Sequence, residues 1–181
     1  ALSFEELFQQ AKALPWEEWI PEDGKFTVTG TSVKSKLHSV PDCQAIIKKA
    51  IVEKLKETYH CEWFKETGPE YIVKATLLKD RATITIDTSG AGLHKRGYRV
   101  KDVAAPMVQI SYWKEGRLLL DPFCGSGTIP IEAALIGKNI APGLNRKFIS
   151  EEWPGIPAKL WKEERKAAFE AIKTDNEIRI Q

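Results

Sequence analysis

The stretch that most constrains this chain is Leu118 to Thr128, LLLDPFCGSGT, in which an apolar run ends in an acid and opens into a tight loop with two glycines. The run Arg117 to Leu120 predicts a short buried strand that brings Asp121 to its carboxyl end, where open α/β sheets bind their ligands. Gly125 and Gly127 have no Cβ, so the backbone can turn sharply and a ligand can lie directly against it. The stretch therefore predicts a ligand-binding turn at the edge of an α/β sheet.

The residues after this loop predict a helix. TIPIEAALIG begins near Thr128, with Ser126 or Thr128 as N-cap, Pro130 in the first turn and Gly137 as the stop. Strand, glycine-rich turn and helix thus follow one another in the order that a nucleoside-binding α/β unit requires.

Three other loop chemistries can be tested letter by letter. A phosphate-binding P-loop needs a Lys after its last glycine, and none follows Gly127. A dinucleotide fingerprint needs a third glycine where Pro130 stands, and a hydrolase elbow needs a glycine where Cys124 stands, two residues before Ser126. None of the three fits, and a plain strand-to-helix turn without a ligand stays open as the alternative.

Composition limits the class of protein. The chain has 181 residues and 43% hydrophobic content, which is enough for one ordinary domain or two small ones. No apolar run approaches the roughly 18 to 20 residues of a membrane span, and the start ALSFEELFQQ lacks the features of a signal peptide, so we expect a soluble, cytoplasmic protein without a membrane partner. The net charge of +2 is too small to indicate nucleic-acid binding by itself.

The cysteines indicate free thiols. Cys43, Cys61 and Cys124 form no CxxC pair and no metal-binding spacing with the three histidines, which favours a reducing compartment over disulfides or a metal site. For Cys124, a small packing residue of the loop is the preferred interpretation over a nucleophile.

The first hundred residues predict a mixed α and β unit with antiparallel signals. The expected elements are a helix from Phe4 to Leu14, a strand from Lys25 to Gly30, a helix from Pro41 to Tyr59, and two strands, Tyr71 to Leu78 and Arg81 to Thr88. The long helix is expected to place Ile46, Ala50, Ile51 and Leu55 on one face. The two last strands predict a hairpin turning at Lys79 and Asp80, although Lys-Asp is not the favoured turn sequence.

The last eighty residues follow α/β order. We place a first domain at residues 1–88, a basic linker at 89–102 and a second domain at 103–181. In the second domain, a helix from Ala158 to Lys173 is expected to turn Leu160, Trp161, Ala168 and Ile172 to its apolar side, and Glu177 to Gln181 begins a strand.

Two basic clusters indicate nucleic acid. LHKRGYRVK contains His94, Lys95, Arg96, Tyr98 and Arg99, and no acid. Lysines and arginines neutralise phosphates, while the Tyr98 and His94 rings can stack on a base. Lys34 and Lys36 form a weaker second cluster. For both clusters, a solvated charged surface without a ligand is the alternative.

Five stretches resemble one family, the bacterial THUMP-containing methyltransferases that modify guanine N2 of large-subunit (23S) ribosomal RNA, some of which carry the name of adenine-specific DNA methylases. They are ALPWEEWIPEDGKF, SVKSKLHSVPDCQ, DTSGAGLHKRGYR, DPFCGSGTIPIEAA and NIAPGLNRKF, and together they span nearly the whole chain. DPFCGSGT alone is shared with many amino-group methyltransferases, so its combination with LHKRGYR and APGLNR points to this family. The implied fold class is α/β and α+β, a partial THUMP-like RNA-binding module followed by the first part of a Rossmann-like methyltransferase domain.

The resemblance also implies ligands. S-adenosylmethionine is the implied cofactor, and its binding residues are those of the loop, Asp121, Pro122, Phe123, Cys124, Gly125, Ser126, Gly127 and Thr128. The implied partner is ribosomal RNA, and the two basic clusters provide the candidate contact residues Lys34, Lys36, His94, Lys95, Arg96, Tyr98 and Arg99. Two alternatives stay open, an N6-adenine DNA methylase and a non-catalytic RNA-binding fragment.

The chain also departs from the family pattern. Family members are longer, so we expect this chain to be a fragment, with the ribose-binding acid and the catalytic Asn-Pro-Pro-aromatic motif beyond Gln181. A further helical segment is expected between Pro106 and Gln109, where AAPMVQISYW lacks it.

Overall fold

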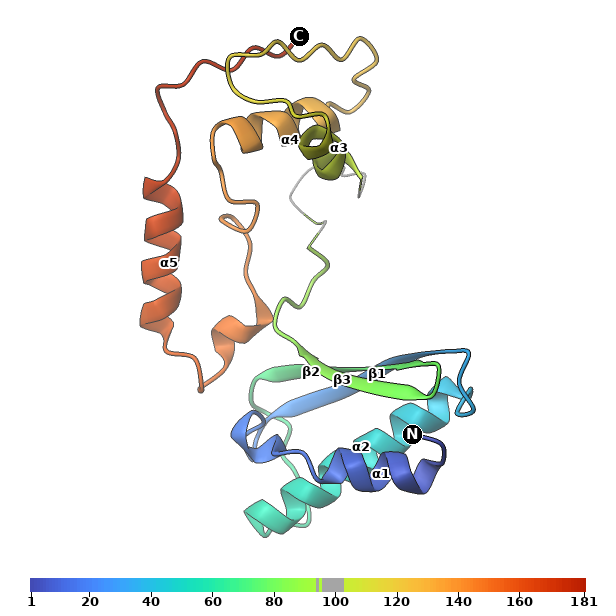
Figure 1. The fold of residues 1–181 in the computed structure, drawn as a ribbon. Helices are drawn as coiled ribbons and strands as arrows, with labels where there is room; N and C mark the ends of the chain where they lie inside the picture. Colours follow the sequence, from blue (N-terminus) through green and yellow to red (C-terminus); the bar gives the residue numbers. More distant parts are fainter. Residues whose placement is uncertain (94, 96–102) are drawn as a thin grey trace. The chain divides into compact units, whose positions relative to one another are not determined.

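The computed structural model describes residues 1–93, 95 and 103–181 (Figure 1). These residues divide into two compact units. The first comprises Ala1–Gly90 and Glu152–Gly155, and the second comprises Ala91–Glu151 and Ile156–Gln181. The short segment Glu152–Gly155 therefore belongs to the first unit, although it lies far along the sequence from the rest of that unit.

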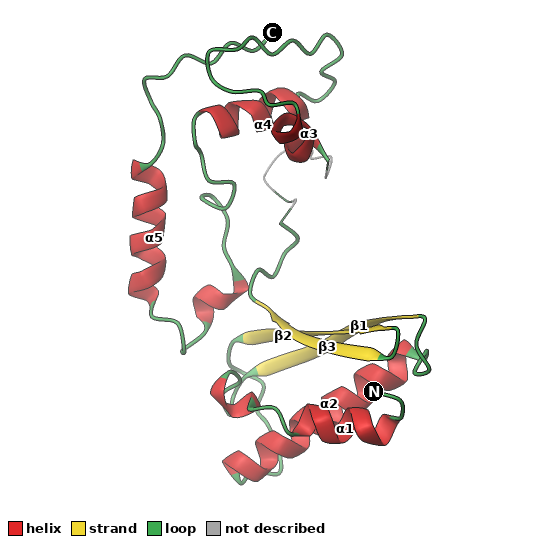
Figure 2. Cartoon of the chain, viewed as in Figure 1, coloured by secondary structure: helices red, strands yellow, loops and turns green. Residues whose placement is uncertain are grey.

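The first unit is a three-stranded sheet with two helices on one of its sides (Figure 2). Its elements are α1 (Phe4–Lys12), the 3-10 helix η1 (Trp16–Glu18), β1 (Lys25–Val33), α2 (Val40–Tyr59), β2 (Glu70–Leu78) and β3 (Arg81–Asp87). The predicted helices and strands are confirmed, with shifted ends. β1 and β2 run parallel, which the sequence did not predict, and they pair Val33 with Leu78. α2 is the crossover helix that such a parallel pair needs.

The core of this unit lies between the sheet and the helices. Alternate residues of β2 are buried, and apolar faces of α1 and α2 cover them. The buried residues are Tyr71, Val73, Ala75 and Leu77 of β2, Cys43, Ile47, Ala50, Ile51 and Leu55 of α2, and Leu7 and Ala11 of α1. The prediction that Ile46 belongs to this face was wrong, because Ile46 is half-buried and Ile47 is fully buried. The period of 3.6 residues aligns Ile47 with Cys43 and Ile51.

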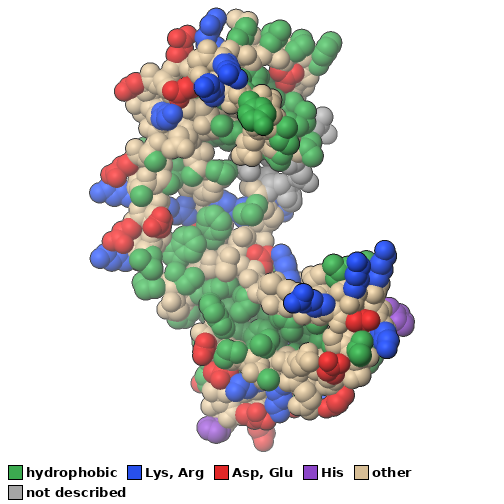
Figure 3. Space-filling view, viewed as in Figure 1, with side chains coloured by type: hydrophobic (Ala, Val, Ile, Leu, Met, Phe, Trp, Pro, Cys, Tyr) green, Lys and Arg blue, Asp and Glu red, His purple; other side chains and the backbone are tan. Residues whose placement is uncertain are grey.

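The predicted hairpin of β2 and β3 is confirmed, and its turn is tied to a second loop. Lys79 and Asp80 both have left-handed backbones, with φ of 50° and 64°. The Lys36 amide donates to the Asp80 carboxylate at 2.6 Å, and the Asp80 amide donates to the Ser35 hydroxyl at 3.0 Å. These bonds compensate for an unfavourable turn sequence and hold the loop after β1 against the hairpin. Figure 3 shows Lys and Arg side chains gathered at this end of the unit.

The second unit contains α3 (Ala104–Ile110), α4 (Thr128–Gly137), α5 (Ala158–Glu170) and the 3-10 helix η2 (Ile149–Glu152) except for its last residue, Glu152. The two strands predicted in this unit are reduced to one parallel bridge between Leu119 and Ile180. The Leu119 amide donates to the Arg179 carbonyl at 2.9 Å, the Gln181 amide donates to the Leu119 carbonyl at 3.0 Å, and the Asp121 amide donates to the Gln181 carbonyl at 2.8 Å. The prediction of a buried strand was wrong, because Leu118 and Leu120 are 47% and 66% exposed.

One prediction for a helix of this unit needs correction. No residue of α5 is buried, and Leu160, expected on its apolar side, is 51% exposed. Trp161 does pack, because its ring stacks on Phe148 with 5.5 Å between centroids. The family segment that the sequence lacks between Pro106 and Gln109 has no counterpart here either, since these residues lie inside the short helix α3.

α4 ends at Gly137 as predicted, and this glycine has a second role. It is the last residue of α4, and the left-handed residue that turns the chain is Asn139, with φ of 55°. A Cβ on Gly137 would lie 2.8 Å from Ile178 Cδ1 and 3.0 Å from Trp113 Cη2. This glycine therefore allows close packing against the last residues of the chain.

No helix among the described residues has the length and apolar character needed to cross a membrane.

Candidate functional site

The loop from Asp121 to Thr128 is a tight turn fixed by its own backbone. The Gly127 amide donates to the Cys124 carbonyl at 2.9 Å, and the Phe123 amide donates to the Asp121 carboxylate at 3.3 Å. Gly125 and Gly127 both have left-handed backbones, with φ of 55° and 73°. Other L-residues rarely adopt this conformation, so the turn itself requires the two glycines.

The predicted N-cap was wrong. Gly127 precedes α4 as the N-cap residue, and α4 has no side-chain cap. Ser126 and Thr128 lie with their hydroxyl oxygens 3.0 Å apart and bond to each other. The left-handed turn at Gly127 moves the helix start past Ser126. The first turn of α4 carries the partial positive charge of a helix start, which suits an anionic group of a ligand.

The loop leaves space for a ligand. A Cβ on Gly125 would meet no atom closer than Phe123 O at 3.9 Å, and a Cβ on Gly127 would meet none closer than Ile131 Cδ1 at 3.8 Å. A hollow of about 300 Å³ lies over the loop, lined by Asp121, Phe123, Cys124, Gly125, Ser126, Thr128 and Ile129. The structure thus brings six of the eight predicted loop residues around one open space, with Pro122 and Gly127 in the same turn.

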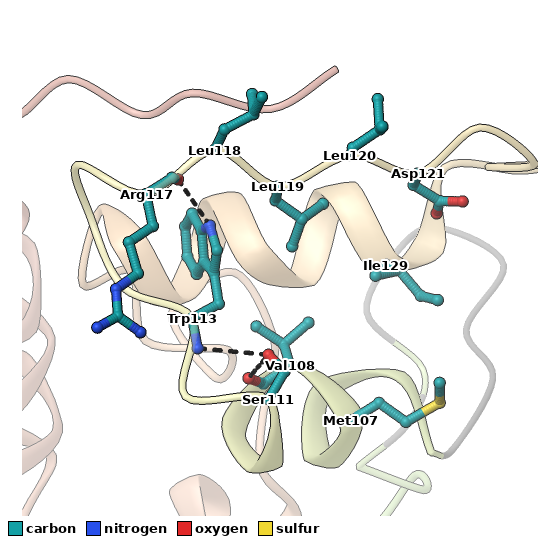
Figure 4. A pocket seen from close by; sticks show the side chains of 10 residues that line it. All are labelled: Met107, Val108, Ser111, Trp113, Arg117, Leu118, Leu119, Leu120, Asp121 and Ile129. Carbon is teal, nitrogen blue, oxygen red and sulfur yellow. Dashed lines mark hydrogen bonds between the residues drawn. The ribbon is translucent and has the colours of Figure 1, made fainter.

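A second cavity of about 470 Å³ shares Asp121 and Ile129 with this hollow (Figure 4). In the close-up, Leu119 and Ile129 point toward Met107 and Val108 of α3, whereas Leu118 and Leu120 point away. The Trp113 indole closes one end by donating to the Arg117 carbonyl at 2.9 Å. Apolar walls, one carboxylate and a helix start are the parts of a site for a ligand with both apolar and charged groups.

The second basic cluster is larger than predicted. Lys34 and Lys36 lie in the loop that is bonded to the β2–β3 turn, so they share one end of the sheet with Lys79 and Arg81. We call these four exposed cations the hairpin-tip patch. None of the four forms an ion pair with another residue that the structure describes.

Sequence reasoning missed Lys79 and Arg81. A signal was available, because a strand, a long helix and a second strand in succession indicate a parallel pair whose carboxyl ends lie together. That pairing places Val33 beside Leu78 and brings the residues after both strands to the same edge.

The linker cluster lies mostly outside the described residues. This applies to His94, Arg96, Tyr98 and Arg99. Lys95 is described; it is exposed, and its amide donates to the Gly92 carbonyl at 2.9 Å.

The start of the linker is held by Asp87, the last residue of β3. Burial alone would raise the pKa of this carboxyl, but the Lys74 ammonium at 2.6 Å and the amides of Ser89 and Gly90 reverse the effect and lower it. The carboxylate therefore stays ionised and fixes where the chain leaves the sheet.

Two family models match the chain. Residues 1–87 match the THUMP domain, and residues 96–180 match the RMKL-like methyltransferase domain. The fold is thus mixed α and β, a THUMP domain followed by a methyltransferase domain.

Three relatives carry methyltransferase names. The Bacillus subtilis (strain 168) protein named "Putative RNA methyltransferase YpsC" is 54% identical over 190 residues, covering 99% of this chain and 49% of YpsC. Ribosomal RNA large subunit methyltransferase K/L of Cellvibrio japonicus is 34% identical over 173 residues, covering 88% of this chain and 23% of that protein. The tRNA (guanine(6)-N2)-methyltransferase of Methanocaldococcus jannaschii is 31% identical over 156 residues, covering 81% and 41%. The chain spans about half the length of YpsC and less of the other two.

Two solved structures superpose on nearly the whole chain. A "predicted N6-adenine-specific DNA methylase" from Listeria monocytogenes is 51% identical with a TM-score of 0.94, and 99% of this chain matches 50% of that one. SMU.472, described as a methyltransferase complexed with SAH, is 46% identical with a TM-score of 0.93 over the same shares. By these matches the chain combines a THUMP domain with an RMKL-like methyltransferase domain, and it is similar to proteins that are named as methyltransferases.

Proposed function

We propose that the full-length protein transfers a methyl group from S-adenosylmethionine to RNA, and that the loop Asp121 to Thr128 holds the cofactor. The observation that carries this proposal is the open left-handed glycine pair at the start of α4. It gains support from SMU.472, a structure complexed with SAH that superposes on 99% of this chain.

Each part of the loop has a role in this proposal. The start of α4 would hold the carboxylate of the cofactor, because a helix start favours negative charge. Gly125 and Gly127 would let the cofactor lie on the backbone, and the Asp121 carboxylate would accept hydrogen bonds from its amino group. When bound, the cofactor supplies an electrophilic methyl carbon on a sulfonium. The protein's contribution is to hold the attacking amine in line with the carbon–sulfur bond.

We further propose guanine N2 of ribosomal RNA as the acceptor. In this reaction the nitrogen–carbon bond forms as the carbon–sulfur bond breaks, and the amine then loses a proton. Support comes from the names of the K/L relative, for ribosomal RNA, and of the tRNA relative, for guanine N2.

RNA would be held by the two basic clusters. The hairpin-tip patch presents four exposed cations, and the linker carries Lys95 with His94, Arg96, Tyr98 and Arg99 in sequence. Lysine and arginine neutralise phosphates with little dependence on base sequence, while rings stack on bases. A grip on RNA is needed because a base must leave its stack before its amine can be methylated.

Calorimetric titration of the full-length protein with S-adenosylmethionine tests the cofactor site. Gly125→Asp should abolish binding, because it places a charged side chain where the cofactor would lie and strains the left-handed turn. Gly155→Asp is the matched control, since a Cβ there meets no atom within 4 Å and the residue lies outside the loop. Absence of binding to the unmodified protein would overturn the proposal.

The Listeria structure's name favours a second candidate, an N6-adenine DNA methylase. Transfer of labelled methyl groups to deproteinised ribosomal RNA and to duplex DNA separates the two candidates. Transfer to RNA alone removes the second, and transfer to DNA alone removes the first.

A third candidate is RNA binding without turnover. Replacing Lys95, Arg96 and Arg99 by Ala should weaken RNA binding and reduce its salt dependence. If affinity and salt slope stayed the same, the role proposed for the linker would be wrong. RNA binding by a full-length protein that transfers no methyl group would leave this third candidate.

A further inference from the structure

Arg165 of α5 organises the loop that precedes η2. Its guanidinium donates to the Leu144 carbonyl at 2.6 Å, to the Arg146 carbonyl at 2.6 Å and to the Glu151 carboxylate at 2.5 Å. Glu151 in turn accepts a bond from the Phe148 amide at 2.8 Å. One arginine side chain therefore fixes the backbone on both sides of Arg146.

The Arg146 side chain extends from this fixed backbone to the start of the linker. Its guanidinium lies 5.0 Å from the centroid of the Phe148 ring, which itself stacks on Trp161. One terminal nitrogen donates to the Gly92 carbonyl at 3.4 Å, and the other donates to the Ala91 carbonyl. A planar guanidinium can bridge two successive carbonyls in this way, whereas an ammonium has no such fork.

The carbonyl that Arg146 contacts also closes the turn that carries Lys95. The Gly92 carbonyl accepts the Lys95 amide at 2.9 Å, so Arg146 and Lys95 share one acceptor. The Lys95 residue is exposed, whereas Arg146 is half-buried with both terminal nitrogens directed at backbone carbonyls. Lys95 is thus placed to meet a phosphate, and Arg146 is placed to hold the turn.

We propose that Arg146 is a positioning residue for RNA binding. It orders the turn from Gly92 to Lys95 and thereby presents Lys95 to the phosphates, without contacting RNA itself. This inference rests on the proposed function, in which Lys95 binds RNA. It assigns an RNA-related role to a residue far along the sequence from both basic clusters.

A double-mutant cycle tests the inference. The full-length protein, Lys95→Ala, Arg146→Ala and the double variant are titrated with fluorescently labelled, deproteinised ribosomal RNA at several salt concentrations. Lys95→Ala should weaken binding and lower the salt slope by about one. Arg146→Ala should also weaken binding and lower the salt slope. The double variant should have the same affinity and salt slope as Lys95→Ala alone, because the two residues act through one contact.

Two further variants separate positioning from charge. Arg146→Lys keeps the charge but loses the fork, so it should bind RNA as weakly as Arg146→Ala. Lys147→Ala removes an exposed charge next to Arg146 and should leave the effect of Lys95→Ala unchanged in a parallel cycle. S-adenosylmethionine affinity and far-UV circular dichroism, measured on every variant, show that the loop and the fold persist.

The outcomes are distinguishable. Additive losses in the cycle, or full rescue by Arg146→Lys, would mean that Arg146 acts by its own charge and would overturn the inference. An unchanged affinity and salt slope for Lys95→Ala would overturn the RNA role proposed for Lys95 and the inference with it. An effect of Lys95→Ala without one of Arg146→Ala would overturn the inference alone.

Discussion

Tyr71 shows how a single side chain can both stabilise and destabilise this fold. Its ring is fully buried and stacks on Trp153 with 4.7 Å between centroids. Its hydroxyl has no hydrogen-bond partner among the described residues. Burial raises the pKa of this hydroxyl, and the nearby Asp23 carboxylate adds to the effect. A buried hydroxyl without a partner destabilises the folded state, whereas the stacked ring stabilises it.

Tyr71→Phe should therefore raise the free energy of unfolding, by up to about 1 kcal/mol, because it keeps the stack and removes the unpaired hydroxyl. Urea unfolding near pH 7 measures this. Tyr59→Phe is the matched control, since the Tyr59 hydroxyl donates to the Ile20 carbonyl at 2.8 Å. In this control variant the free energy of unfolding should fall by about 1 kcal/mol. Equal losses in both variants would show that the Tyr71 hydroxyl has a stabilising partner.

At the scale of elements, the end of α4 depends on the absence of one methyl group. Gly137→Ala would bring a Cβ within 2.8 Å of Ile178 and 3.0 Å of Trp113, and the Gly137 carbonyl also accepts a bond from Asn176 at 2.6 Å. Alanine normally favours a helix by about 1 kcal/mol over glycine, but here we expect a net loss of about 1 to 3 kcal/mol. Thermal unfolding measures the change, with Gly155→Ala as an unhindered control. A stabilised Gly137→Ala variant would contradict this account of the packing.

The end of β3 makes stability depend on pH. The pKa of Asp87 is lower in the folded chain than in the unfolded chain, where it is about 3.9. The ionised Asp87 therefore stabilises the fold at a pH above this unfolded pKa, and this stabilisation is lost as the pH falls through the folded pKa. Asp87→Asn should destabilise the first unit by about 1 kcal/mol at pH 7, and the difference from the unmodified protein should shrink below about pH 4. Urea unfolding at a series of pH values measures it. A difference that is constant with pH would mean that the Asp87 charge does not matter.

The sequence predicts local elements well and long-range pairing poorly. The period of α2 and the alternation of β3 are encoded by neighbouring residues, and both elements are found where expected. The parallel pairing of β1 with β2 depends on contacts between distant residues, and so does the hairpin-tip patch that it creates. In the candidate site, the loop was predicted from its letters. The cap at Gly127 was not, because the left-handed turn there decides where α4 begins.

At the scale of the whole molecule, Trp153 connects two parts of the chain that the family matches assign to different domains. It lies inside the range that matches the methyltransferase domain, but it is buried in the first unit. Its indole donates to the Glu70 carbonyl at 3.0 Å, at the start of β2. The stability of the THUMP unit therefore depends on residues that a cut between the two matched ranges would remove.

Trp153→Ala should destabilise the first unit by about 3 to 5 kcal/mol, through lost burial and lost stacking on Tyr71. Hydrogen exchange followed by mass spectrometry should show faster exchange in β2 and α2 and unchanged exchange in α4. Trp161→Ala, which removes the stack on Phe148, should leave exchange in β2 unchanged. Faster exchange in β2 for both variants would mean that the two units do not unfold separately.

The bridge between Leu119 and Ile180 also has a consequence for synthesis. A ribosome that adds roughly 5 to 20 residues per second needs about 3 to 12 s to make the residues between these two partners. The β2–β3 hairpin, whose partners are adjacent in sequence, can close as soon as it has emerged. The glycine loop after Leu120 cannot form its contacts until the residues around Ile180 have been made. The part of the chain proposed to bind the methyl donor is therefore fixed later during translation than the hairpin tip proposed to bind RNA.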